Sequence, residues 1–386
     1  MNIAVPKEIV EGERRVALVP ETAKRLIGEG HTVRVEHDAG RAAGYPDDAY
    51  TVVGVEIAPE AVSLWGAADV ILKIHMPAPL VSGGHEADLT RPEAPVIGLL
   101  QPLSNLAGVR ALAKAKATSF SLDALPRITR AQSMDVLSSM STVAGYKAVV
   151  LAAATLGKFF PMLVTAAGTI APARVLILGA GVAGLQAIAT ARRLGAVVEA
   201  FDVRAAVKEQ VESLGAKFIE DESTATADAE GAGGYAKELS EDQHQRELAL
   251  IHKHIVDADV VVTTALIPGR PAPELITDAM VSAMRPGSVI VDLAAEAGGN
   301  CVHTRAGEDV MHGHVLILGP RNLPSTMPTH ASQMFSKNMA TFVRHIVSDG
   351  VLKLDMEDEI TGATCITRNG EIAHEATRKA LAGGGS

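Results

Sequence analysis

Cysteine, aromatic residues and positive charge are all scarce in this chain. Its 386 residues include two cysteines, and aromatic residues make up 3% of the total. Cys301 and Cys365 are too few for a disulfide framework or a cysteine metal motif, so we expect two buried thiols in a reducing cytoplasm and no metal site. The formal net charge of −10, with no clustered basic and aromatic segment, argues against nucleic acid as a partner.

Long apolar runs are missing as well. Residues 143–156 come closest, but they carry Lys147 and fall short of the roughly 18 residues of a membrane span. The sequence begins directly with a strand-like run, Ile3 to Val5, so we expect no signal peptide. These features predict a cytoplasmic protein without direct membrane insertion. We expect the glycine-rich end, residues 383–386, to contribute nothing to the fold.

A glycine turn between two strand-like runs is the most informative motif. Gly179, Gly181 and Gly184 follow an apolar run and open a helical pattern, and Asp202 ends the next apolar run. This order of strand, turn, helix, strand and acidic residue is the dinucleotide fingerprint. The first glycine allows the sharp turn, the second lets the backbone approach the pyrophosphate, and the third lets helix and strand pack closely. We expect the nucleotide to contact Gly179, Ala180, Gly181, Val182, Gly184, Asp202, Val203 and Arg204.

Asp202 also bears on the choice of dinucleotide. Its carboxylate can accept hydrogen bonds from a ribose 2′-hydroxyl and would repel a 2′-phosphate, which favours NAD(H) over NADP(H). Arg204 argues the other way, because a nearby arginine is how such sites hold the phosphate. It could instead lie against the adenine or be solvated. The balance favours NAD(H).

Strand-like and helical patterns alternate along most of the chain, which predicts parallel sheets with helices on both faces. We expect an α/β protein with two doubly wound, Rossmann-like domains and a cleft between them. Residues 1–133 and 330–386 would form the first domain and residues 134–329 the NAD-binding domain, with residues 134–157 as a bridging helix. Expected strands are residues 2–5, 32–36, 70–74, 96–99, 118–122, 174–178, 260–264, 288–293 and 315–318, and expected helices include residues 20–28, 106–114 and 330–347. Thr264, Ala265 and Leu266, at the end of one strand, are expected to line the nucleotide.

One acidic, glycine-rich segment, residues 220–240, is too polar for the core and too long for a routine connection. It is either a surface loop or a lid whose Gly234 and Tyr235 close over the nucleotide.

Residues 126–149, PRITRAQSMDVLSSMSTVAGYKAV, resemble the NAD(H)-binding component of proton-translocating NAD(P) transhydrogenases. The similarity covers essentially the whole chain and includes IAVPKEIVEGERRVALVPE, FDVRAAVKEQVESLGAKF, GAGGYAKEL, VVTTALIPGRPAPELIT and PGSVIVDLAAEAGGNC. The resemblance implies that NADH bound here passes hydride to NADP(H) held on a partner subunit. It also implies a homodimer, docked through membrane-spanning subunits on the inner face of the cell membrane.

The same resemblance assigns roles at the nicotinamide. It implies that Arg127 and Asp135 hold the carboxamide, that Ser138 assists, and that Gln132 reaches toward the second nucleotide. The residue types fit, because a carboxamide has a donor and an acceptor that one Asp and one Arg can satisfy. Taken without the family, Arg127 and Asp135 could equally form a surface ion pair at the start of the long helix.

The sequence also resembles alanine dehydrogenase, which is the alternative function. Arg15 stands where that family holds the substrate carboxylate, but the positions of its lysine, histidine and aspartate carry His75, Gln101 and Glu296 here. Oxidation of an amino acid needs a proton acceptor, and glutamine cannot titrate. Hydride transfer between two nicotinamide rings needs only close juxtaposition of the rings. Arg15 and Lys73 would then be structural. A third class, a module that only senses NAD, leaves Arg127, Gln132 and Asp135 without a purpose.

Overall fold

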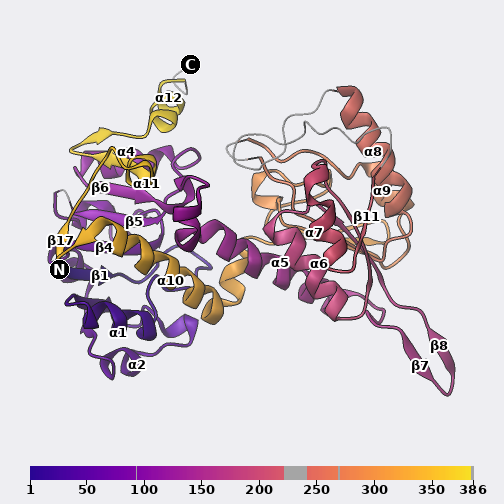
Figure 1. The fold of residues 1–386 in the computed structure, drawn as a ribbon, viewed down its shortest axis with the longest axis horizontal. Coiled ribbons are helices and arrows are strands. Elements are labelled where there is room, and N and C mark those ends of the chain that lie inside the picture. Colours follow the sequence, from indigo (N-terminus) through magenta and orange to yellow (C-terminus); the bar gives the residue numbers. More distant parts are fainter. Residues whose placement is uncertain (93, 221–240, 268–269, 384–386) are drawn as a thin grey trace. The chain divides into compact units, whose positions relative to one another are not determined.

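The computed structural model describes residues 1–383 except residue 93, residues 221–240 and residues 268–269. Backbone contacts divide the chain into two compact units, residues 1–140 with 324–386 and residues 141–323. Each unit contains one large, mainly parallel sheet with helices packed on it (Figure 1). The expected pair of doubly wound α/β folds is confirmed.

The sheet of the first unit has the order β19-β18-β6-β5-β4-β1-β2-β3. Leu64 and Trp65 of α3 and Val109 and Leu112 of α4 pack on one face of the sheet. On the β6 strand, the Phe120 ring packs against Phe342 of α10, with centroids 5.6 Å apart. The strands are β1 (Asn2–Val5), β2 (Thr32–Glu36), β3 (Glu56–Ala58), β4 (Val70–His75), β5 (Pro95–Leu99), β6 (Thr118–Ser121), β18 (Cys365–Arg368) and β19 (Glu371–Ile372).

Two of the helices predicted in the first unit have the predicted bounds, and a third begins two residues earlier than predicted. The expected helices at residues 20–28 and 106–114 are α1 and α4. The helix expected from residue 330 begins earlier, because Pro328 occupies its first turn, where the fixed φ of proline suits a helix start. The helices are α1 (Pro20–Gly28), α2 (Asp47–Thr51), α3 (Ala61–Gly66), α4 (Leu106–Lys114), α10 (Pro328–Ile346), α11 (Glu359–Thr364) and α12 (Glu375–Gly383), with a short hairpin of β16 (Val347–Ser348) and β17 (Val351–Leu352).

The sheet of the second unit has the order β11-β10-β9-β12-β13-β15-β14. Residues of β9 alternate between two apolar layers, which is why both faces carry helices: Val175 and Ile177 face the layer of α6, and Leu176 and Leu178 face the layer of α8 and α9. The elements are β9 (Arg174–Leu178), α6 (Val182–Arg193), β10 (Val197–Phe201), α7 (Lys208–Ser213), β11 (Lys217–Phe218), α8 (Glu241–Ile255), β12 (Val260–Thr263), α9 (Asp278–Ala283), β13 (Val289–Asp292), β14 (Asp309–His312) and β15 (Val315–Leu318).

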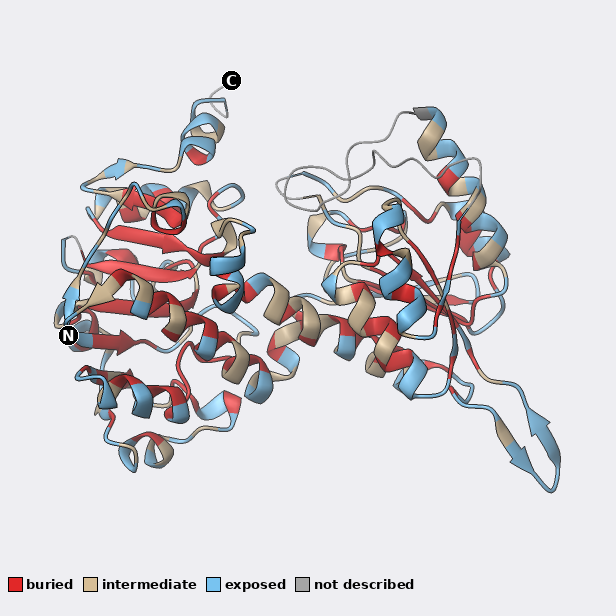
Figure 2. Ribbon diagram, viewed as in Figure 1, coloured by how far each residue is buried: buried red, intermediate tan, exposed pale blue. Residues whose placement is uncertain are grey.

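Three antiparallel strands at sheet edges, β14, β18 and β19, and the hairpin of β7 (Leu163–Thr165) and β8 (Gly168–Ile170), were not expected. Antiparallel partners need no crossover helix, so the alternation of strand and helix patterns gives no signal for them. The hairpin projects from the second unit, and its strands are mostly exposed, in contrast to the buried strands of the sheet (Figure 2).

Helix α5 (Val136–Thr155) replaces the helix expected over residues 134–157. It is the one helix in the described residues that is long and apolar enough to cross a membrane, which corrects the expectation that no segment reaches that length. Much of α5 packs inside the protein: 39% of its most apolar window is buried, and a Cβ on Gly145 would collide with the carbonyl oxygen of Ala183 in α6. Glycine at this position therefore allows α5 to lie close to α6.

Candidate functional site

The glycine turn follows β9 in the second unit. Gly179 has a φ of +98°, and a Cβ there would lie 2.5 Å from Oγ1 of Thr264. A Cβ on Gly184 would collide with the carbonyl oxygen of Gly179, so helix α6 can approach the turn only with glycine there. At Gly181, by contrast, a Cβ would meet nothing within 4 Å. Gly179 and Gly184 are required by the fold itself, whereas the space at Gly181 is open.

Asp202 follows β10 and binds the glycine turn directly. Its Oδ2 accepts a hydrogen bond from the N–H of Ala180 at 2.7 Å, and its Oδ1 accepts one from the N–H of Arg204 at 2.9 Å. The Arg204 guanidinium folds back onto the same carboxylate, with Nη2 2.9 Å from Oδ2. The structure thus pairs Arg204 with Asp202, a contact that none of the roles considered from the sequence included. Val203, between the two, is half-buried.

Glu247 of α8 adds a second carboxylate near Asp202, and no sequence motif predicted it. Burial raises the pKa of Glu247, a hydrogen bond from His244 at 3.2 Å opposes the rise, and the charge of Asp202 adds to it. In the sequence, Glu247 is marked only by its position on the core-facing side of a helical pattern, and an apolar residue would be expected at the same position.

The segment after β12 contains Thr264, Ala265 and Leu266. Oγ1 of Thr264 donates to the carbonyl oxygen of Gly179 at 3.1 Å, so this side chain fastens the turn. Leu266 is 45% exposed and Val182, at the start of α6, is 43% exposed, which leaves two apolar side chains beside the open face of the turn. An apolar surface of this kind suits the flat ring of a bound base.

Two buried residues that no motif predicted hold this segment in place. The side-chain amide of Asn300 forms paired hydrogen bonds with the N–H and the carbonyl of Ala265, at 3.1 and 3.0 Å. Asp292, at the end of β13, accepts from the N–H of Asn300 at 2.7 Å and from Oγ1 of Thr263 at 2.8 Å. Both residues are fully buried, so they position Ala265 rather than contact a ligand.

The residues expected at the nicotinamide lie on one short segment of the first unit: Arg127 precedes a 3₁₀ helix (Thr129–Met134) that contains Gln132, Asp135 follows that helix, and Ser138 is in the first turn of α5. Arg127 and Gln132 are exposed. The carboxylate of Asp135 accepts from the N–H of Ser138 at 2.9 Å and from its Oγ at 2.5 Å, and so caps α5.

Asn338 of α10 anchors this segment and was also missed. Its Nδ2 donates to the carbonyl of Ser133 at 2.9 Å, and its Oδ1 accepts from Oγ of Ser139 at 2.7 Å. The two contacts lie on either side of Asp135, so the backbone that carries Asp135 is held from a helix about 200 residues away in the chain. Long-range anchoring of this type leaves no local pattern.

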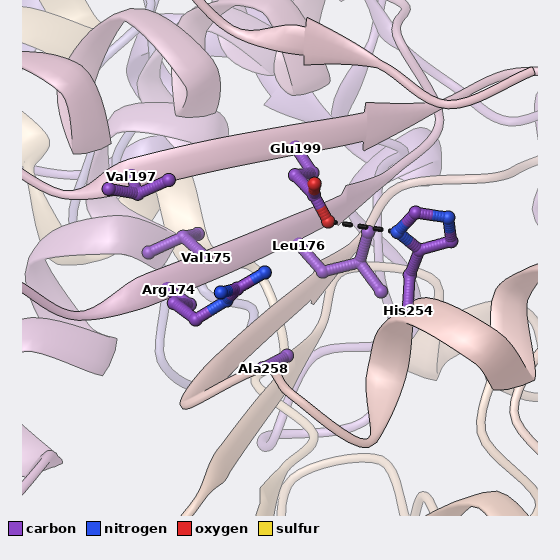
Figure 3. A pocket seen from close by; sticks show the side chains of 7 residues that line it. All are labelled: Arg174, Val175, Leu176, Val197, Glu199, His254 and Ala258. Carbon is purple, nitrogen blue, oxygen red and sulfur yellow. Dashed lines mark hydrogen bonds and ion pairs between the residues drawn. The ribbon is translucent and has the colours of Figure 1, made fainter.

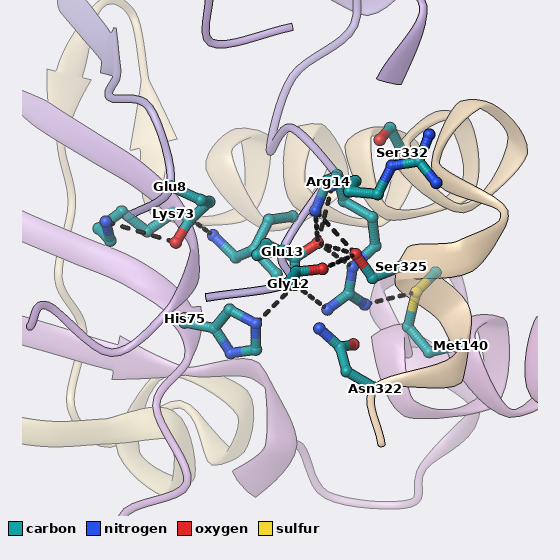
Figure 4. Close-up of polar contacts among 12 residues, drawn as sticks. Glu8, Gly12, Glu13, Arg14, Lys73, His75, Met140, Asn322, Ser325 and Ser332 are labelled. Atoms are coloured by element: carbon teal, nitrogen blue, oxygen red, sulfur yellow. Dashed lines mark hydrogen bonds and ion pairs between the residues drawn. The ribbon is translucent and has the colours of Figure 1, made fainter. Parts of the chain in front are cut away.

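Arg15, which alanine dehydrogenase shares, Lys73, and His75, which stands where that family has a lysine, belong to two groups of charged residues in the first unit (Figure 4). In one, Oε2 of Glu13 lies 2.6 Å from both Nη2 of Arg15 and Nε2 of His75. Burial would raise the pKa of Glu13, but hydrogen bonds from Arg15 and His75 lower it far below its usual value.

In the other group, Nζ of Lys73 is fully buried, 2.9 Å from Glu86 and 3.4 Å from Glu8. Burial would lower the pKa of Lys73, but the charges of Glu8 and Glu86 raise it, so the amine stays protonated. The expectation of structural roles for Arg15 and Lys73 fits these contacts. Gln101 has a left-handed backbone with φ of +48°, and Glu296 is exposed.

Gly234 and Tyr235, the residues expected in a lid, lie outside the described residues. A small cavity in the second unit is lined by Arg174, Glu199 and His254, away from the glycine turn (Figure 3), and the ion pair of His254 with Glu199 at 2.9 Å is one side of its lining. This cavity is not where the fingerprint places the nucleotide, because Arg174 begins β9 and the glycine turn follows its end.

Comparison with known proteins covers both units. The family described as "Alanine dehydrogenase/PNT, N-terminal domain" matches residues 4–144, and its C-terminal domain matches residues 148–375. The chain is 50% identical over 378 residues to an NAD(P) transhydrogenase alpha subunit of Rhodospirillum rubrum, covering 97% of this chain and 98% of that one. It is 30% identical to the alanine dehydrogenase of Halomonas elongata, covering 99% and 97% of the two chains.

A solved structure is similar as well. The crystal structure of a transhydrogenase from Sinorhizobium meliloti superimposes with a TM-score of 0.86 at 44% identity, covering 96% of this chain and 100% of that chain. The resemblance to transhydrogenases is therefore confirmed, with alanine dehydrogenase as a more distant relative. This chain belongs to the alanine dehydrogenase/PNT family, and within it the chain is more similar to the transhydrogenase alpha subunits than to the alanine dehydrogenases that it matches.

Proposed function

We propose that this chain is the NAD(H)-binding component of a proton-translocating NAD(P) transhydrogenase and that it passes hydride from NADH to NADP⁺ held on a partner subunit. The full-length similarity to transhydrogenase alpha subunits supports this function, and the open space at Gly181 is the structural observation that carries it. A turn whose other two glycines are packed against protein, but whose middle glycine faces open space, suits a pyrophosphate at the start of α6.

In this proposal the second unit binds the adenosine and pyrophosphate. The N–H groups at the start of α6, from Gly181 onward, receive the phosphates, and Asp202 accepts a hydrogen bond from the ribose. Ala180 and Gly179 shape the turn, and Val182, Val203 and the segment Thr264 to Leu266 lie along the nucleotide. NADH supplies the hydride, and this chain's residues bind and orient the ring that carries it.

Charge supports NAD(H) as the nucleotide. Asp202 and Glu247 bring two carboxylates together, and Arg204 is already paired with Asp202. A 2′-phosphate would meet these two carboxylates, and the Arg204 guanidinium is already paired with one of them, whereas a ribose hydroxyl can donate to a carboxylate oxygen. NADP(H) is therefore assigned to the partner subunit.

The first unit supplies the residues proposed to orient the nicotinamide: Arg127 and Asp135 bind the carboxamide, Ser138 assists, and Gln132 faces the second nucleotide. The hydrogen bonds from Ser138 hold the Asp135 carboxylate in one orientation, as a positioning role requires. Transfer of hydride between two rings moves no proton to a heteroatom, so Gln101 in place of a histidine is no obstacle to it.

We further propose a homodimer attached to the inner face of the membrane through membrane-spanning subunits, with no nucleic acid involved. The exposed hairpin of β7 and β8 is the surface that we expect to contact a second copy of this chain in the dimer. An isolated two-stranded hairpin is marginally stable in water, and Met162, Val164 and Ile170 on or beside it are 59%, 76% and 43% exposed. Val164→Lys should shift the protein toward monomer in sedimentation, whereas an unchanged mass would remove this hairpin from the interface.

The decisive experiment measures hydride transfer from NADH to an NADP analogue after adding the isolated NADP-binding subunit of a related transhydrogenase. Rapid transfer that requires both proteins is expected. Consumption of NADH with pyruvate and ammonium, and none with the NADP-binding subunit, would instead establish the alanine dehydrogenase alternative.

A further inference from the structure

Two histidines and one aspartate converge on the surface of the second unit. Nε2 of His303 lies 2.7 Å, and Nε2 of His312 3.1 Å, from the same oxygen, Oδ1 of Asp278. The two imidazole rings stack with centroids 3.7 Å apart and an interplanar angle of 17°. Three ligand-type atoms therefore lie within 4.8 Å of one another, and none of these residues belongs to the proposed nucleotide site.

Each of the three side chains is held by a different part of the fold. Asp278 is the first residue of α9, behind the Thr277 cap, and His312 ends β14, paired with Val315 of the neighbouring strand. His303 lies in the loop after β13, next to Thr304, whose Oγ1 donates to the buried carboxylate of Asp292 at 2.6 Å. The three ligand atoms are thus held by three separate, structured parts of the second unit, as a preorganised ligand site requires.

The chemistry of the three atoms selects a class of ion. Imidazole nitrogens are preferred ligands of zinc and other late first-row divalent metals, and carboxylate oxygen completes mixed sites of this kind. Bonds of roughly 2.0–2.2 Å in a tetrahedron place neighbouring ligand atoms about 3.3–3.6 Å apart. The separations of 2.7 and 3.1 Å between the imidazole nitrogens and the carboxylate oxygen are shorter, so binding of the ion would move each nitrogen away from the oxygen by up to about 0.9 Å.

We propose that Asp278, His303 and His312 bind one zinc-like divalent metal ion, with water at the remaining positions. The side chains of His303, His312 and Asp278 are 25%, 33% and 66% exposed, so water can reach the ion. The ion ties α9, the loop that carries His303 and the edge strand β14 to one another. Magnesium and calcium, which prefer oxygen ligands, are not expected to compete.

A second group in the described residues, His37, Asp38 and Asp47, provides an internal comparison. It offers a single imidazole, and a guanidinium is already present, with Nη1 of Arg41 3.3 Å from Asp38. Oδ1 of Asp47 also accepts from the N–H of Asp38 at 3.0 Å. These contacts leave less ligand capacity for a cation, so His37→Ala serves as the matched control.

The test uses the full chain without an affinity tag, stripped of metal with a chelator. Zn²⁺ binding is measured by calorimetry, Co²⁺ binding by visible absorption, and the melting temperature is recorded with and without Zn²⁺. We expect one high-affinity ion per chain, a Zn²⁺-dependent rise in melting temperature, and the same affinity in His37→Ala.

His303→Ala and His312→Ala should each weaken binding by about tenfold or more, because loss of even an outer-shell partner costs about that much. Circular dichroism and the melting temperature without Zn²⁺ check that both variants fold. No binding by the wild type, or equal binding by the folded double variant with both histidines replaced, would overturn the metal site. None of these readouts measures nucleotide binding or hydride transfer, so the result is independent of the proposed function.

Discussion

The two units share a topology but differ in what occupies the point where strand order reverses. In each main sheet the first five strands follow the order 3-2-1-4-5, so the reversal lies between β1 and β4 in one unit and between β9 and β12 in the other. Ligands of open α/β sheets bind at the carboxyl ends of strands at such a point. The same fold thus offers two equivalent positions for a nucleotide.

In the first unit, charged side chains of the protein itself occupy the point between β1 and β4 where the strand order reverses. Glu8, three residues after β1, accepts from the N–H of Ile74 at 2.6 Å and pairs with the buried Lys73. The second unit leaves its position open as far as the described residues show: a glycine turn follows β9, and a Cβ on Gly181 would meet no atom of them within 4 Å. Strand order therefore defines where a ligand could bind, and the first residues after the strand decide whether one can.

The largest expected effect concerns the charges that fill the first unit. Lys73→Met should lower the free energy of unfolding by about 3–5 kcal/mol, because it leaves Glu8 and Glu86 buried without a counter-charge. Urea unfolding at pH 7 measures the loss, with Lys7→Met, which changes an exposed lysine, as the control. A loss no larger than that of the control would mean that Lys73 does not hold this part of the first unit together.

Arg127 tests the division of labour between the units. Arg127→Ala should slow hydride transfer by about 100-fold, because a ring misplaced by about 1 Å reacts that much more slowly. The dissociation constant of NADH should change little, because the second unit holds the rest of the nucleotide. Rates are compared with Arg130→Ala, whose arginine pairs with Asp358 at 2.7 Å. Equal losses in rate and affinity would rule out an orienting role.

Asp202 should show the opposite pattern in the second unit. Asp202→Ala removes a charged hydrogen-bond acceptor worth about 1.5–3 kcal/mol, so NADH should bind roughly 10- to 150-fold more weakly. NADPH should bind more tightly, since one carboxylate near the 2′-position is gone and Arg204 is released. Fluorescence titration with both nucleotides measures the preference, and an unchanged preference would show that the ribose lies elsewhere.

Substitutions at two of the three turn glycines, Gly181 and Gly184, should distinguish an effect on nucleotide binding from an effect on folding. Gly181→Ala should weaken NADH binding by about 1–3 kcal/mol through contact with the pyrophosphate, at an unchanged melting temperature. Gly184→Ala should lower both, because its Cβ collides with the backbone of Gly179. If Gly181→Ala binds NADH as the wild type does, the open space is not the pyrophosphate site.

The last comparison is the pH dependence of the group around Glu13. The pKa of Glu13 is lowered, so its carboxylate stabilises the fold above pH 4.5, the ordinary pKa of a glutamate, and this contribution is lost as the pH falls below that value. Glu13→Gln should therefore reduce the free energy of unfolding by about 1.5–3 kcal/mol at pH 7, the range for a hydrogen bond to a charged group, and leave a flatter decline in acid. Urea unfolding between pH 7 and pH 3 follows the difference, which should shrink as the pH falls; a constant difference would contradict the charged state of Glu13.

Local patterns were enough for many of the elements. The strands Asn2–Val5, Thr32–Glu36 and Arg174–Leu178 have the expected bounds, because apolar runs between turn residues are local signals. The antiparallel edge strands and the exposed hairpin were missed, because short strands without a crossover have no comparable pattern. The turn glycines and Asp202 were found by spacing alone, whereas Asn300 and Asn338 act through contacts with distant segments.

By itself the sequence determined the fold class, the glycine turn with its acidic partner and the family, since each rests on local motifs and on their order along the chain. Only the tertiary structure decided which charges are already paired. Arg204 and Arg15 look in the sequence like free guanidiniums that could hold an anion, but they are bound to Asp202 and Glu13. The convergence of Asp278, His303 and His312 is likewise set by packing. The energy of a buried charge depends on what lies within a few ångströms of it, and the order of residues along the chain does not contain that distance.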